Sequence, residues 1–140
     1  MPQPTNHSTA HWILVVDDEE MVRRLAESML ERLGYRVLSA TNGQEALELY
    51  GEHAAEIDGV LMDLTMPRMD GAAASQALHA LDPALPVILC SGYSEQENAE
   101  RFAELGLAGF IQKPYTLAAL AATVEKALHD EGEGESEQVT

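Results

Sequence analysis

Short apolar runs alternate with segments of helical periodicity from residue 12 to residue 130, and this alternation restricts the fold more than any other feature of the sequence. Five runs have the length and continuous hydrophobicity of strands that are buried on both faces: 12–17, 35–40, 57–63, 86–91 and 108–113. The segments that follow them have apolar residues at helical spacing: 19–35, 42–53, 71–81, 94–105 and 116–130. Five such units predict a parallel sheet with helices on both faces and right-handed crossovers.

The residues at the strand ends are the most informative, because ligands of an open parallel sheet bind beyond the carboxyl ends of its strands, where the strand order reverses. The first strand ends in Asp17 and Asp18, and the third ends in Asp63. The fourth ends in Ser91 and the fifth in Lys113. If the first and third strands are central neighbours, three carboxylates converge in one crevice, flanked by a hydroxyl and an ammonium group.

Three adjacent carboxylates repel one another and need a counter-charge. A hard divalent cation supplies it through oxygen ligands, and Mg²⁺ is the usual choice. The alternative is that each acid only caps the helix that follows it, since helix N-termini favour Asp. That alternative explains Asp18 alone about as well as a metal site does, but it does not explain the whole set of strand-end residues.

The two remaining strand-end residues each have an ordinary alternative. Lys113 can pair with Asp63 or with an anion bound to it, or it can be a solvated lysine at a turn; its position facing an acidic crevice favours pairing. Pro114 holds the turn after it, and a cis Lys113–Pro114 bond is the minority outcome on general grounds, at about 5–6% of such bonds. Ser91 is a candidate hydroxyl donor to an anion, or a simple turn or cap serine.

Charge and composition exclude several classes of function. The chain of 140 residues has a net charge of −16, and a surface this acidic repels phosphate backbones, so we expect a cation or a basic partner rather than nucleic acid. No apolar run approaches the roughly 20 residues that span a bilayer, and the N-terminus lacks the features of a secretory signal. The one cysteine, Cys90, lies in an apolar run and is predicted to be a small core residue. A cytoplasmic setting without a membrane partner fits best.

The composition also divides the chain into three parts. Residues 1–11 are predicted to be a flexible leader, 12–130 a single folded domain, and 131–140 a disordered acidic tail. His53, His79 and His129 stand on predicted helices and are widely separated in sequence, so they are interpreted as solvated or helix-end residues and not as metal ligands. No chemistry is assigned to the two histidines of the leader, His7 and His11.

Four motifs together resemble the receiver domains of two-component response regulators. They are "ILVVDDEE" (13–20), "VLMDLTMPRMDG" (60–71), "LCSGYS" (89–94) and "FIQKPY" (110–115), and their order and spacing match over about 12–130. The resemblance implies a flavodoxin-like fold with strand order 2-1-3-4-5 and five helices.

The same resemblance implies a phosphoryl-transfer site. Asp63 is the expected phospho-accepting aspartate. Asp18 and Asp63 are expected to bind Mg²⁺ directly together with the backbone carbonyl of Thr65, and Asp17 through a water. Lys113 is expected to contact the phosphoryl group.

The implied switch consists of Ser91, as the switch hydroxyl, and Phe110, as the aromatic residue that repacks when Ser91 turns toward the phosphate. For Phe110 a plain core role remains the alternative. The implied donor is a phosphohistidine on a sensor histidine kinase or a histidine phosphotransfer protein, and phosphorylation would change the surface of the fourth helix, fifth strand and fifth helix. A phosphorylation-dependent dimer is compatible with this scheme. We do not expect this domain alone to bind nucleic acid.

Departures from the family pattern concern the lifetime of the acyl phosphate. Thr65 stands where many relatives carry Asn, and Tyr93 stands where a charged or small residue is common. The "SGYS" turn is similar to receivers of hybrid histidine kinases. Residues after 130 are too few and too polar for an output domain, which predicts a single-domain regulator or an excised receiver.

Two other functions are weighed against this prediction. Haloacid-dehalogenase-type phosphatases also form a phosphoaspartate, but they typically need a second Asp at the position of Thr65. A receiver-like interaction module that works without phosphorylation usually lacks one of the five key side chains, and all five are present here: Asp17, Asp18, Asp63, Ser91 and Lys113.

Overall fold

The computed structural model describes residues 11–64, 66, 70–92 and 105–139, with side chains through His129. Its elements along the chain are β1 (Trp12–Val16), α2 (Glu20–Arg32), β2 (Arg36–Ala40), α3 (Gly43–His53), β3 (Ile57–Asp63), α4 (Gly71–Leu81), β4 (Val87–Ser91), β5 (Gly109–Gln112) and α6 (Leu117–Val139). The predicted alternation of strand and helix is therefore present except between β4 and β5, where the predicted helix lies almost wholly outside the described residues.

All five strands pair in parallel in the order β2-β1-β3-β4-β5, which confirms the predicted topology and the flavodoxin-like class. β1 and β3 are central neighbours, so the condition on which the predicted crevice depends is met. Strand order reverses at β1, because the chain moves from β1 outward to β2 and then returns to β3 on the other side. The carboxyl ends of β1 and β3 therefore lie at the topological switch point.

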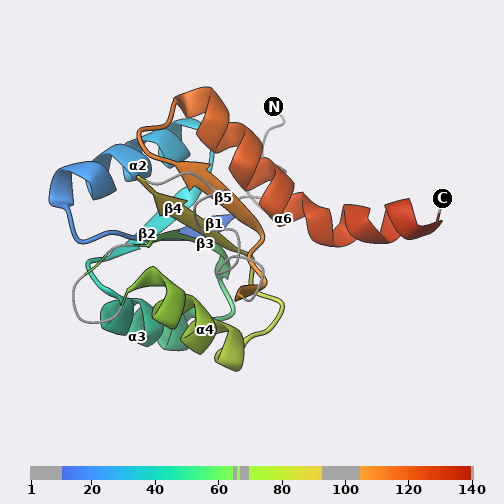
Figure 1. Ribbon diagram of the computed structural model, residues 1–140, viewed down its shortest axis with the longest axis horizontal. Coiled ribbons are helices and arrows are strands. Elements are labelled where there is room, and N and C mark those ends of the chain that lie inside the picture. The colour runs from blue at the N-terminus through green and yellow to red at the C-terminus, as the bar shows by residue number, and fades with distance from the viewer. Residues whose placement is uncertain (1–10, 65, 67–69, 93–104, 140) are drawn as a thin grey trace, which may run out of the picture.

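Helices cover both faces of the sheet, with α2 and α6 on one side and α3 and α4 on the other (Figure 1). Alternate residues of each strand serve the two layers, since successive side chains of a strand point to opposite faces. Leu14 and Met62 pack in the core with α3 and α4, whereas Ile13 and Leu61 pack in the core with α2 and α6. Cys90 is buried in the second of these cores, as predicted for a small core residue.

The helix termini follow sequence signals. Asn42 caps α3 by accepting the Glu45 N–H at 2.8 Å, and Glu45 accepts the Thr41 N–H at 2.7 Å in return. Gly34 follows the end of α2 with φ of 99°, a left-handed conformation that glycine adopts without steric cost. Glycine is common directly after a helix C-cap, and here it follows the cap residue Leu33.

Two expectations about helices need comment. The described residues contain four helices rather than five, because the predicted helix 94–105 falls almost wholly outside them. At the other end, α6 continues to Val139 and extends away from the body of the molecule (Figure 1), through a segment for which the sequence predicts no order. Glutamate is a good helix former, which accounts for the continuation despite two glycines. Within the described ranges no helix is long and apolar enough to cross a membrane.

Candidate functional site

The register of β1 and β3 brings the predicted carboxylates together. Val16 is paired with Met62, so the residues that follow them, Asp17 and Asp63, lie side by side at the switch point. One carboxylate oxygen from each of Asp17, Asp18 and Asp63 lies within 4.8 Å of the others. Asp17 and Asp63 are buried, whereas Asp18 is exposed at the mouth of the cluster. The three acids can therefore share one cation that enters from the solvent.

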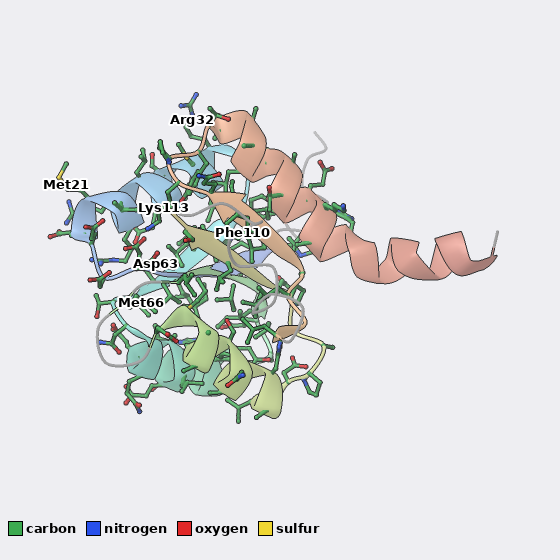
Figure 2. All side chains as sticks on the ribbon, in the orientation of Figure 1. Met21, Arg32, Asp63, Met66, Phe110 and Lys113 are labelled. Atoms are coloured by element: carbon green, nitrogen blue, oxygen red, sulfur yellow. The ribbon has the colours of Figure 1, made fainter. Side chains whose placement is uncertain are left out.

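Lys113 contacts two of the three carboxylates of this cluster. Its Nζ donates to Asp63 Oδ1 at 2.9 Å and to Asp17 Oδ2 at 3.0 Å, and Figure 2 shows Lys113 directed toward Asp63. Its backbone N–H donates to the Ser91 carbonyl at 2.7 Å, which fixes the end of β5 against β4. The Lys113–Pro114 bond is cis, the minority outcome on general grounds. Pairing with Asp63 was one of the two alternatives for Lys113, and the second partner, Asp17, was not expected.

Burial dominates the electrostatics of the acceptor. Desolvation raises the pKa of Asp63, the hydrogen bond from Lys113 opposes this, and the neighbouring Asp17 and Asp18 add to it, so that the pKa of Asp63 reaches about 6. For Lys113, burial acts to lower the pKa, but the hydrogen bonds from Nζ to Asp63 and Asp17 outweigh it and the pKa is raised. Lys113 is thus a permanent cation, while the Asp63 carboxylate is more basic than an exposed one.

Asp17 is oriented by local contacts that the sequence analysis did not identify. Its Oδ1 accepts the N–H of Glu19 at 3.0 Å, and its backbone carbonyl accepts from Arg23 Nη1 at 3.0 Å. Arg23 lies on the first turn of α2, where basic residues are not favoured by the helix dipole. A basic residue in the first turn of a predicted helix is therefore a sequence signal that Arg23 has a specific partner.

Gly71 is a second residue whose role was missed. It begins α4, and its N–H donates to the Leu64 carbonyl at 2.8 Å. A Cβ at this position would lie 2.3 Å from the backbone oxygen of Asp63 and 2.8 Å from Cα of Leu64. α4 therefore starts directly against the main chain of the acceptor. The sequence motif contains Gly71, but a steric requirement of this kind depends on the tertiary approach of two segments.

The remaining predicted residues are placed as follows. Ser91 is buried at the end of β4, and Phe110 is half-buried on β5, where it packs against the core shared with α3 and α4. β4 and β5 pair so that Phe110 is opposite Leu89 and Gln112 is opposite Ser91. Thr65 and Tyr93 lie outside the described residues.

The donor set suits a hard divalent cation. All three clustered side chains offer carboxylate oxygens, which Mg²⁺ prefers, and the exposed Asp18 leaves room for the waters that Mg²⁺ retains. The half-buried ammonium group of Lys113 is not enough to neutralise three carboxylates, so a bound cation would relieve the remaining repulsion. The residues present therefore fit Mg²⁺.

Comparison with protein-family models decides the class. Residues 13–125 match the model described as "Response regulator receiver domain". The chain belongs to this family. It is a receiver domain of the kind found in two-component signalling systems, as the four sequence motifs predicted.

Individual relatives agree with this assignment. The receiver domain is 34% identical over 121 residues to the chemotaxis protein CheY of Bacillus subtilis, covering 86% of this chain and 99% of CheY. It is 37% identical over 124 residues to the sensor kinase CckA of Brucella abortus, covering 89% of this chain but only 13% of the kinase. Among solved structures, a response regulator receiver domain protein of Clostridium thermocellum has a TM-score of 0.81 at 28% identity, covering 87% of this chain and 97% of that one.

Proposed function

We propose that this receiver domain accepts a phosphoryl group on Asp63 from a phosphohistidine and thereby changes its partner-binding surface. The observation that carries the proposal is the contact of Lys113 Nζ with Asp63 at 2.9 Å inside a cluster of three carboxylates whose oxygens lie within 4.8 Å. A buried nucleophile, a fixed cation and a cation-binding set of oxygens are what phosphoryl transfer requires.

In the proposed step, a carboxylate oxygen of Asp63 forms a bond to phosphorus while the phosphorus–nitrogen bond of the donor imidazole breaks. The bonding electron pair stays with the imidazole, and Asp63 becomes an acyl phosphate. Desolvation keeps the acceptor carboxylate basic, consistent with its raised pKa of about 6. Lys113 remains charged and neutralises the phosphoryl oxygens as they approach.

The cation site supports this step. Asp18 and Asp63, with the carbonyl of Thr65, would hold Mg²⁺ directly, and Asp17 would do so through a water. When bound, Mg²⁺ supplies charge neutralisation for the transferring phosphoryl group. Asp17 is also positioned to hold Lys113 near Asp63, through its 3.0 Å contact with Nζ.

The response is proposed to pass through the end of β4 and β5. Ser91 lies next to Lys113 through the 2.7 Å backbone hydrogen bond, so a dianionic group on Asp63 would attract its hydroxyl. Phe110 would repack in response, and the surface of the predicted helix 94–105, β5 and α6 would change. This is a local charge event that biases an element with two arrangements.

The proposed partners are a sensor histidine kinase or a histidine phosphotransfer protein, and the proposed location is the cytoplasm. Full-length CheY of Bacillus subtilis and the much longer CckA of Brucella abortus are both matched, so a separate regulator and a domain of a hybrid kinase are both consistent with the comparisons. The chain spans 13% of CckA and 26% of the transcriptional regulatory protein ZraR of Escherichia coli, so the activities of those whole proteins are not carried over.

The test is incubation of the protein with acetyl phosphate or phosphoramidate, with and without Mg²⁺, followed by intact mass measurement. We expect a Mg²⁺-dependent gain of one phosphoryl mass in the wild type and none in Asp63→Asn. Asp70→Asn is a matched control, because Asp70 caps α4 beside the site but lies outside the carboxylate cluster.

If no adduct forms, titration with beryllofluoride distinguishes two outcomes. Beryllofluoride binding that requires Mg²⁺ and Asp63 would indicate a competent site whose acyl phosphate hydrolyses quickly. Absence of both adduct and beryllofluoride binding, with Mg²⁺ binding shown separately, would refute the proposal and favour an interaction module that works without phosphorylation.

A further inference from the structure

Two histidines from distant parts of the chain meet near the amino ends of the central strands β1 and β3, whereas the carboxylate cluster lies at the carboxyl ends of the same strands. His11 precedes β1 and His129 lies on α6, and their ring centroids are 6.3 Å apart in an edge-to-face arrangement. Asp58, at the start of β3, completes the group: its Oδ2 lies 3.4 Å from His11 Nδ1. We call His11, Asp58 and His129 the distal histidine cluster.

The backbone around the cluster is held in place. Asp58 Oδ2 accepts the N–H of Trp12 at 2.9 Å, which fixes the carboxylate beside His11. On α6, Leu128 packs so closely on Gly59 that a Cβ there would lie 3.0 Å from its Cδ2. The residues adjacent to both histidines are thus anchored to β3, while the imidazoles remain accessible, with the His11 side chain 41% exposed and His129 exposed.

We propose that the distal histidine cluster binds a divalent transition-metal ion that prefers imidazole, such as Zn²⁺ or Ni²⁺. Two imidazoles on one tetrahedral ion have centroids about 5–5.5 Å apart, for metal–nitrogen bonds of about 2.1 Å. The observed separation needs only a small approach and a rotation of the exposed His129 ring about its side-chain bonds, which is inexpensive at a surface. Water fills the other positions.

Asp58 supplies the feature that distinguishes this pair from a chance contact. Histidines that bind a metal through one nitrogen usually present the other to a carboxylate, which fixes the tautomer and strengthens the ligand. Nδ1 of His11 faces Asp58, so Nε2, on the other side of the ring, is the nitrogen that binds the ion. The net charge of −16 adds a general attraction for cations.

The two cation sites are chemically different and lie at opposite ends of the strands. The carboxylate cluster offers only oxygen and suits Mg²⁺, whereas the distal histidine cluster offers nitrogen, for which Mg²⁺ has little affinity. Saturating Mg²⁺ therefore blocks the first site and leaves the second open. The inference does not depend on phosphorylation of Asp63.

The experiment uses the full chain without an affinity tag, in saturating Mg²⁺. Trp12, the single tryptophan, adjoins His11 and reports Ni²⁺ binding by quenching of its fluorescence, while calorimetry measures the affinity for Zn²⁺. We expect saturable binding of one ion. We expect His11→Gln and His129→Gln each to weaken it at least about tenfold, and Asp58→Asn to weaken it by about tenfold or more.

His53→Gln is the matched control. His53 also contacts a carboxylate, with Nδ1 2.9 Å from Glu56, but it has no second imidazole in contact within the described part of the chain. Its replacement should leave both signals unchanged. The proposal is overturned if Zn²⁺ and Ni²⁺ do not bind the wild type in Mg²⁺, or if binding persists at full strength in His129→Gln, whose fold is verified by circular dichroism.

Discussion

At the scale of single residues, the buried carboxylate of Asp63 destabilises the fold when it is ionised and no cation is bound. Its pKa is raised from 3.8 to about 6, mainly by burial, so the fold favours the protonated form. The stability that this group contributes is therefore fully present below about pH 4 and is lost as the pH rises through about 6. At pH 8 the ionised Asp63 costs roughly 2–3 kcal/mol at about 1.4 kcal/mol per pKa unit.

Asp63→Asn should therefore stabilise the metal-free protein. We expect its free energy of unfolding at pH 8 in EDTA to exceed that of the wild type by roughly 1–3 kcal/mol, less than the full electrostatic cost because Lys113 loses an ionic partner. The difference should shrink toward zero as the pH falls below 5. Urea denaturation at several pH values measures it, and an equal difference at pH 4 and pH 8 would contradict the assigned cause.

Mg²⁺ should reverse the order of stability. An ion that binds only the folded state stabilises it by mass action, about 2.7 kcal/mol at a hundred times its dissociation constant. Thermal unfolding should show a clear rise in midpoint for the wild type on adding Mg²⁺ and a much smaller rise for Asp63→Asn, which removes one of the three clustered carboxylates. Equal rises in both proteins would place the ion elsewhere.

The strand-end residues could be predicted because a parallel sheet assigns them a common edge without any knowledge of side-chain contacts. Asp17 and Asp63 lie side by side once β1 and β3 are neighbours, and Lys113 pairs with Asp63, which was one of the outcomes considered for it. What could not be predicted depends on the approach of segments that are separate in sequence. Arg23 on the carbonyl of Asp17 and the contact of His11 with His129 are of this kind.

At the scale of elements, the start of α4 sets the position of the acceptor. Gly71→Ala would put a Cβ against backbone atoms, which cannot rotate away. We expect a loss of about 2–3 kcal/mol in stability and slower phosphorylation, because either α4 or the end of β3 must shift. Stopped-flow fluorescence or mass spectrometry with phosphoramidate would measure the rate.

Gly51→Ala is the control for this substitution. A Cβ at Gly51 meets nothing within 4 Å, and the residue lies inside α3. Alanine there should stabilise the protein by up to about 1 kcal/mol through helix propensity and leave the phosphorylation rate unchanged. If the two alanine variants behaved alike, close approach at Gly71 would not be the cause.

Element bounds show where sequence signals are local and where they are not. The caps at Asn42 and Asp70 and the stop at Gly34 depend on neighbouring residues, so the predicted ends of α3, α4 and α2 differ from the observed ones by three residues or fewer. The end of α6 does not follow from packing periodicity, because its apolar spacing stops before the helix does. The predicted helix 94–105 lies almost wholly outside the described residues and stays a prediction.

At the scale of the whole molecule, the folded unit is proposed to end near residue 130. Among the side chains of α6 that the structure describes, which run through His129, the buried ones are Leu120, Val124 and Ala127. Beyond residue 130, α6 extends away from the sheet (Figure 1) and carries four glutamates near a helix C-terminus, where negative charge is unfavourable. Removal of residues 131–140 should therefore change the free energy of unfolding by well under about 1 kcal/mol. Because 1 kcal/mol corresponds to about 2–8 °C in domains of this size, the unfolding midpoint should change by no more than about 2 °C.

A truncation after Ala122 provides the contrast, because it removes Val124 and Ala127 from the core shared with α2. Loss of these buried side chains, together with the last turns of the helix that carries them, should cost several kcal/mol, so this shorter chain should be largely unfolded at room temperature. Thermal scans followed by circular dichroism, together with the phosphoramidate reaction, compare the two truncations. A fall of several degrees on removing 131–140 alone would mean that the acidic end of α6 contributes to the fold, and the domain boundary would then move toward the C-terminus.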